Sequence, residues 1–112
     1  MGDFIRVIGL DQLGKKLTKN LDINKVKKVV RVNGSEMQQK AQKYVPVDTG
    51  TLKRSITLEI TDGGMAAEVE PHTEYAAYVE YGTRKMAAQP YMKPAFEEQS
   101  KQFEKDMKGL VK

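Results

Sequence analysis

The chain has 112 residues, of which 39% are hydrophobic and 30% are charged, and its formal net charge at pH 7 is +4. This length matches one ordinary domain, so we expect residues 1–112 to form a single domain. Because there is no cysteine and the only histidine is His72, the sequence excludes a disulfide framework and a thiolate nucleophile, it disfavours a metal site, and we expect no cofactor.

The N-terminal part is predicted to hold a short strand and two helices. Residues 3–8 are rich in strand-forming residues, and Gly9 ends the run. Leucines at spacings of three and four then predict a short amphipathic helix over residues 10–21. A second helix is expected over residues 23–44, with Asp22 as its N-cap. At roughly 33 Å it would be longer than a domain of this size is wide, so we expect part of it to contact a partner subunit.

A corner is predicted to follow this helix. Pro46 cannot continue the hydrogen-bond ladder, so the helix should end before it. In the tight connection that comes next, Asp48 can cap backbone amides and Gly50 can adopt a positive φ.

A β-hairpin is predicted next. Apolar and polar residues alternate over residues 52–61, which indicates a half-buried strand. The turn would be Asp62-Gly63-Gly64, and residues 65–70 would form the returning strand, which Pro71 ends.

The C-terminal part is predicted to hold two helices separated by a loop. Residues 74–81 are helix-like, with Gly82 as the C-cap. Residues 83–91 show no periodicity and carry two basic side chains, which is typical of an exposed loop. A final helix is expected over residues 94–109, with Pro94 in its first turn. The apolar stripe of that helix would consist of Phe96, Gln99, Phe103, Met107 and Leu110.

Taken in order, these elements predict an α+β fold with a small antiparallel sheet. The hairpin 52–61/65–70, together with the N-terminal strand, would pack against the long helix 23–44 and the C-terminal helix 94–109.

Two patterns resemble catalytic sites, but neither is complete. Asp48-Thr49-Gly50 could belong to a dimeric aspartic protease. However, Pro46 interrupts the approach to it, and no later pair of apolar residues is followed by glycine. Glu68 and Glu70 share one face of a strand, where a solvated hairpin face is the simpler interpretation. We therefore expect no catalytic residues and no enzymatic activity.

Positive charge is concentrated in the first part of the chain. Residues 1–48 carry 10 basic and 5 acidic side chains, whereas residues 49–112 carry 9 and 10. This pattern is typical either of a solvated helix face or of a small basic nucleic-acid-binding domain, although no aromatic residue lies within the run to stack on bases. The basic residues that produce the excess are Lys15, Lys16, Lys19, Lys25, Lys27, Lys28 and Arg31.

Apolar runs in the chain are only a few residues long, and the N-terminus lacks the pattern of a secretory signal. We therefore expect a soluble protein without a membrane partner.

Three segments carry a resemblance to a known family. They are VPVDTGTLKRSI at residues 45–56, YAAYVEYGT at residues 75–83 and QPYMKPA at residues 89–95. In this order they resemble the neck, or tail-completion, proteins of tailed bacteriophages and prophages, the gene-product-ten-like family.

The resemblance implies a structural protein with no catalytic role. It would form a homo-oligomeric ring at the virion neck, between the head connector and the tail, after assembly in the host cytoplasm. Its partners would be head-completion and tail-terminator proteins, with non-specific contact to packaged DNA. In this interpretation Lys25, Lys27, Lys28 and Arg31 face the DNA or an acidic neighbouring ring.

The same resemblance assigns structural or assembly roles to residues of the three segments. The tyrosines 75, 78 and 81 would pack across the sheet, in the core, or across a subunit boundary. The corner between helix and sheet would be set by Pro46, Asp48, Thr49 and Gly50, and the other motif residues are Leu52, Ser55, Tyr75, Tyr78, Gly82, Thr83, Pro90 and Pro94.

Overall fold

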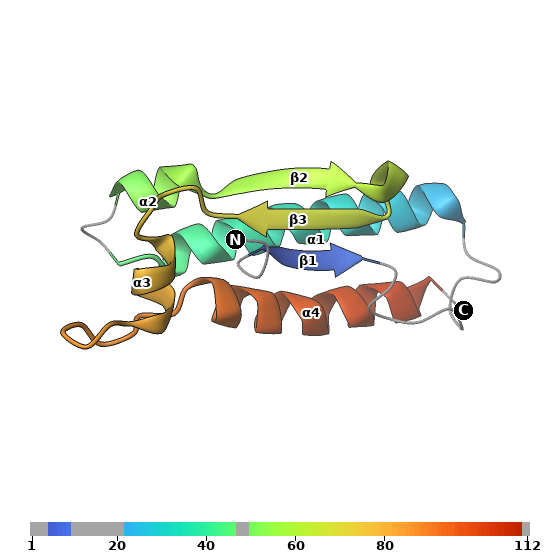
Figure 1. Cartoon of the computed structure of the whole chain (residues 1–112). Helices are drawn as coiled ribbons and strands as arrows, with labels where there is room; N and C mark the ends of the chain where they lie inside the picture. Colours follow the sequence, from blue (N-terminus) through green and yellow to red (C-terminus); the bar gives the residue numbers. More distant parts are fainter. Residues whose placement is uncertain (1–4, 10–21, 47–49, 111–112) are drawn as a thin grey trace.

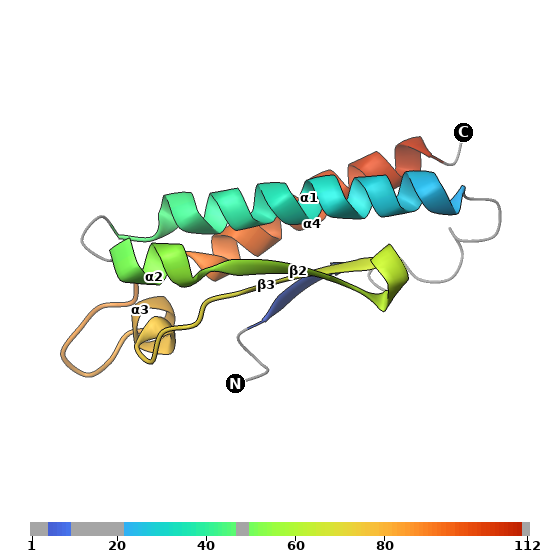
Figure 2. The same ribbon diagram turned by 90° about the horizontal axis from the view of Figure 1, so that it is seen from above.

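The computed structural model describes residues 5–9, 22–46 and 50–110. A three-stranded antiparallel sheet packs one face against two long helices that run side by side (Figures 1 and 2). The elements in chain order are β1 (Arg6–Gly9), α1 (Ile23–Tyr44), α2 (Gly50–Ser55), β2 (Thr57–Thr61), the 3-10 turn η4 (Asp62–Gly64), β3 (Ala66–Glu70), α3 (Ala76–Tyr81) and α4 (Met92–Gly109). The predicted α+β class is confirmed.

Strand β3 lies at the centre of the sheet, between β1 and β2. Ala67 and Val69 of this strand are fully buried. Because successive side chains of a strand point to opposite faces, these two define the face that packs against the helices. The alternate residue Glu68 lies on the other face, where it is directly opposite Val7 of β1 and Glu59 of β2.

Helix α1 has the bounds that its periodicity predicts. The Asp22 side chain accepts a hydrogen bond from the backbone N–H of Asn24 at 2.9 Å, which is the expected N-cap. The helix ends at Tyr44, and Val45 is extended before Pro46. Its buried residues lie along one stripe and comprise Val26, Val30, Asn33, Gly34, Met37 and Ala41.

Helix α4 runs along α1, and the molecule is elongated in this direction, with principal extents of 51 × 22 × 19 Å (Figure 1). The sheet and α4 cover the buried stripe of α1 within one chain. The length of α1 therefore does not require a partner subunit, in contrast to the expectation from the sequence. A cation–π contact adds to the packing of the sheet on α4, because the Arg6 guanidinium lies 5.7 Å from the centre of the Phe96 ring.

A buried polar network joins the two long helices. Gln99 of α4 is fully buried and donates hydrogen bonds to Asn33 Oδ1 at 2.6 Å and to Glu36 Oε1 at 2.9 Å. Its own amide oxygen accepts a hydrogen bond from Lys40 Nζ at 2.7 Å. Asn33 in turn donates to Asp106 Oδ2 at 2.9 Å. These directional bonds fix the register of α4 along α1.

The strand predicted over residues 52–61 is wrong in its first part, which is helix α2. Leu52 and Ile56 are both buried, and their spacing of four residues fits one helical turn as well as one face of a strand. Arg54, which the strand interpretation placed on the buried face, is exposed. The strand itself is limited to Thr57–Thr61, while the predicted turn and returning strand are confirmed.

The remaining differences concern element ends. Helix α3 begins two residues later than predicted and α4 two residues earlier. Pro94 is still in the first turn of α4, where no intrahelical N–H is required. The helix predicted over residues 10–21 lies outside the described residues.

Candidate assembly surface

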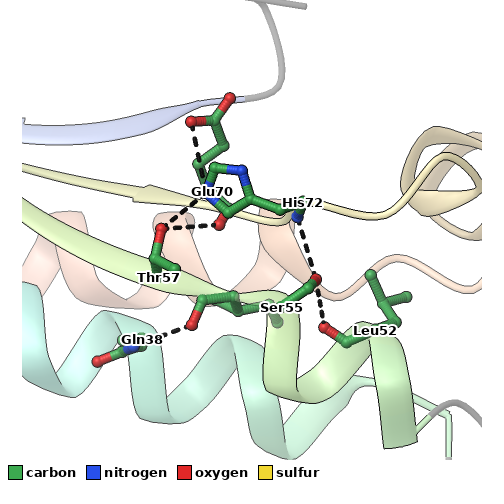
Figure 3. A network of polar contacts seen from close by, with 7 residues as sticks. Gln38, Leu52, Ser55, Thr57, Glu70 and His72 are labelled. Atoms are coloured by element: carbon green, nitrogen blue, oxygen red, sulfur yellow. Dashed lines mark hydrogen bonds and ion pairs between the residues drawn. The ribbon is translucent and has the colours of Figure 1, made fainter.

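The first of the three sequence motifs, residues 45–56, forms the corner between α1 and the sheet; residues 75–83 and 89–95 are the second and third motifs. The Ser55 hydroxyl donates to the Leu52 carbonyl at 2.7 Å and accepts from the backbone N–H of His72 at 3.0 Å (Figure 3). On the other side, the Gln38 amide of α1 donates to the Ile56 carbonyl at 3.0 Å. Ser55 therefore ties the end of α2 to the segment that leaves the hairpin.

Three corner residues differ from the sequence interpretation or cannot be compared with it. Gly50 is the first residue of α2 and is not among the glycines with positive φ, so conformational freedom does not explain its presence. Asp48 and Thr49 lie outside the described residues. Pro46 is half-buried directly after α1.

The second and third motifs meet at a buried carboxylate. Glu80 of α3 is 3% exposed, and its two oxygens accept hydrogen bonds from the backbone N–H groups of Tyr91, Met92 and Lys93 at 3.1, 2.8 and 3.0 Å. The fully buried Tyr91 donates from its hydroxyl to the Ala76 carbonyl at 2.9 Å. Burial, followed by the nearby Glu80 carboxylate, raises the pKa of Tyr91.

This anchor closes the base of the loop between α3 and α4. Gln89 N–H donates to the Val79 carbonyl at 2.8 Å, and Gly82, at φ 80°, ends α3 as predicted. Within the loop, Thr83 and Met86 exchange backbone hydrogen bonds at 2.8 and 3.3 Å. Residues 83–90 are all exposed, Pro90 included. The loop is therefore a surface feature with a rigid base, and it forms one end of the molecule (Figure 1).

The tyrosines in α3 and at its N-cap are surface residues. Tyr75, Tyr78 and Tyr81 are 37%, 59% and 57% exposed, and Met86 of the adjacent loop is 39% exposed. Core packing of these tyrosines, one of the options from the sequence, is thus wrong, and it is Val79 that faces the core. Exposed aromatic residues grouped on one surface are typical of contacts between proteins.

The basic residues of α1 do not form one uniform surface. Lys25, Lys28 and Arg31 are exposed. Lys27 is partly buried because its aliphatic stem lies over the hairpin turn, where a Cβ atom at Gly64 would be 2.9 Å from Lys27 Cγ. Of the four basic residues predicted to face DNA or an acidic ring, the other three are therefore the ones that face solvent.

The outer face of the sheet carries carboxylates. Glu59, Glu68 and Glu70 project from it, and Glu59 and Glu68 are direct cross-strand neighbours. His72 is exposed. Its Nε2 atom forms a hydrogen bond with Thr57 Oγ1 at 2.8 Å and lies 3.8 Å from Glu70 Oε1 (Figure 3). Among the residues that the structure describes, no group of three or more His, Cys, Asp or Glu could hold a metal ion.

The sequence alone does not single out Glu80, because a glutamate in a short helix is ordinarily exposed. Its position four residues after Ala76 is nevertheless a signal, since it places Glu80 on the buried side of α3.

Comparison with known protein families gives a match over most of the chain. Residues 10–82 match the model of a family described as "Bacteriophage HK97-gp10, putative tail-component". The matched region contains residues 45–56 and residues 75–82 but not residues 89–95, and it does not support the nucleic-acid-binding alternative. No curated protein and no solved structure matches the chain. In the described residues, no helix is both long and apolar enough to cross a membrane.

Proposed function

Because the chain belongs to the HK97-gp10-like family of phage tail components, we propose that it is a structural protein of the head–tail junction that assembles as a ring between the head connector and the tail. Head-completion and tail-terminator proteins are its partners in this proposal, and it has no catalytic role. Its place is the virion neck, which it reaches after assembly in the host cytoplasm.

One structural observation supports the proposal independently of the family match. The exposed tyrosines and the loop 83–90 stand on a base that Glu80 holds through three backbone hydrogen bonds. A surface that is rigid before binding loses less conformational entropy when it meets a partner. This arrangement suits a protein whose role is to bind its neighbours in a particle.

The test is removal of the gene from a phage or prophage that carries it. We expect DNA-filled heads and separate tails by electron microscopy, with infectivity restored when the intact gene is supplied in trans. The protein should be found at the neck by immunogold labelling, and extracted necks should contain it as a ring. Normal particles without the gene would contradict the proposal, as would labelling elsewhere on the virion.

Contact with DNA or with an acidic neighbouring ring requires a separate experiment. The exposed Lys25 and Lys28 of α1 are changed together to glutamate, and the matched control changes the exposed Lys101 and Lys105 of α4 in the same way. We expect fewer infectious particles with the α1 variant only. Normal yields from the α1 variant would exclude this role for α1.

A further inference from the structure

The end of the molecule formed by α3 and the following loop carries an apolar and basic surface, which we name the tip. Its aromatic part is Tyr78 and Tyr81, both more than half exposed. Arg84 and Lys85 follow in the loop and are exposed as well. The tip thus combines large apolar side chains with two cations on a fixed base.

The outer face of the sheet offers the opposite charge. Val7, Glu68 and Glu59 form one row across the three strands, and Val7 is 42% exposed. Like charges directly opposite each other on adjacent strands are destabilising. Within the described residues, no lysine or arginine forms an ion pair with either carboxylate. A cation supplied by another molecule would therefore stabilise this row by offsetting the repulsion between its two carboxylates.

We propose that the tip of one copy binds the Val7–Glu68–Glu59 row of a second copy, an interface that rests on the proposed ring. Arg84 and Lys85 would face the two carboxylates, and the tyrosines would cover Val7. Because the tip and the row are different surfaces of the same chain, the interface is heterologous. Its repetition from copy to copy yields a ring when the rotation between neighbouring copies closes. The carboxylates of the row favour a second copy of this chain over DNA as the binding partner, since they would repel the phosphates of DNA.

The chain contains no cysteine, so pairs of introduced cysteines report contacts without background. Phage are grown with the double variant Lys85→Cys/Glu68→Cys, and purified particles are oxidised and run on a non-reducing gel. We expect a ladder of cross-linked oligomers of this chain. Each single variant should give no ladder, and neither should the control Lys101→Cys/Glu68→Cys, whose lysine lies on α4 away from the tip.

Charge exchange provides the second arm. Lys85→Glu and Glu68→Lys should each lower the infectious titre by at least about tenfold, and the combination should restore it because the pair is reversed. Particles that contain the protein at the neck but yield no ladder and no rescue would overturn this interface while leaving the proposed function intact. Particles that lack the protein altogether would overturn both.

Discussion

The carboxylate of Glu80 caps helix α4 from another element, with its Oε1 accepting a hydrogen bond from the backbone N–H of Met92 at 2.8 Å. The N–H groups at a helix start have no intrahelical partner, and the helix dipole favours a negative charge there. Tyr91, which occupies the N-cap position, makes no side-chain cap. Glu80 therefore supplies both the missing acceptor and the charge, and it closes the loop on which the tip is built.

We expect Glu80→Gln to lower the free energy of unfolding by about 2 kcal/mol, because the charged acceptor is lost and the new amide N–H would face a backbone N–H. Urea unfolding followed by circular dichroism measures this change. The exposed Glu74 offers a matched control, since Glu74→Gln should change the stability by less than about 0.5 kcal/mol. If the two variants were equally stable, the capping role would be refuted.

The long helix and the end of the hairpin could be predicted from the sequence, because their patterns extend over several turns or are marked by proline and glycine. The short helix α2 could not. Leu52, Arg54 and Ile56 alternate as in a strand, while Leu52 and Ile56 alone also fit one helical turn, and six residues do not separate the two periods. The exposure of Arg54 decides between them, because the burial of Leu52 and Ile56 fits both periods, and this exposure depends on tertiary packing.

The candidate surface was only partly predictable for a related reason. The absence of periodicity in residues 83–91 predicts the exposed loop correctly for residues 83–90 but wrongly for Tyr91, which is fully buried, and the place of Gly82 after a helix predicts its role as C-cap. Glu80 acts on amides that are 11 to 13 residues further along the chain, a distance that no local pattern encodes. In the same way, Gln99 reads as one position in an apolar stripe, whereas its partners are on α1.

Gln99 leads to the second prediction. Replacing it with leucine keeps the volume but leaves Asn33 Oδ1 and Lys40 Nζ without their partner between the helices. We expect Gln99→Leu to lower the free energy of unfolding by roughly 1–3 kcal/mol. The same change at the exposed Gln39 of α1 is the control and should have little effect. An unchanged or increased stability of Gln99→Leu in urea unfolding would show that the network does not stabilise the helix pair.

The third prediction concerns the contact of α1 with the sheet. A Cβ atom at Gly34 would lie 2.6 Å from Ala67 Cβ and 3.0 Å from Leu58 Cδ1. We expect Gly34→Ala to destabilise the protein by about 1–3 kcal/mol, because the overlap exceeds the gain in helix propensity of about 1 kcal/mol. The control is Gly109→Ala at the end of α4, where nothing lies within 4 Å of the new atom. That variant should be neutral or slightly stabilised.

A second-site change makes this test specific. Ala67→Gly removes the atom that the new methyl group would meet. The double variant Gly34→Ala/Ala67→Gly should therefore be more stable than the sum of the two single effects predicts. Simple additivity in thermal unfolding would show that Gly34 is not required for close approach of α1 to β3.

The last prediction is the alkaline limit of stability. Because burial raises the pKa of Tyr91 above the ordinary tyrosine value of about 10, the folded chain holds this proton at a pH where the unfolded chain releases it. The contribution of the protonated Tyr91 to the free energy of unfolding is complete below about pH 10. Above that pH it falls by up to about 1.4 kcal/mol per pH unit. Tyr91→Phe removes this dependence, although at pH 8 it should cost about 1 kcal/mol through the lost hydrogen bond to Ala76.

Urea unfolding at several pH values between 8 and about 11.5 should thus show the two stability curves converging above about pH 10. The control Tyr78→Phe, at an exposed position, should run parallel to the unmodified protein, and a parallel curve for Tyr91→Phe would contradict the buried, protonated hydroxyl.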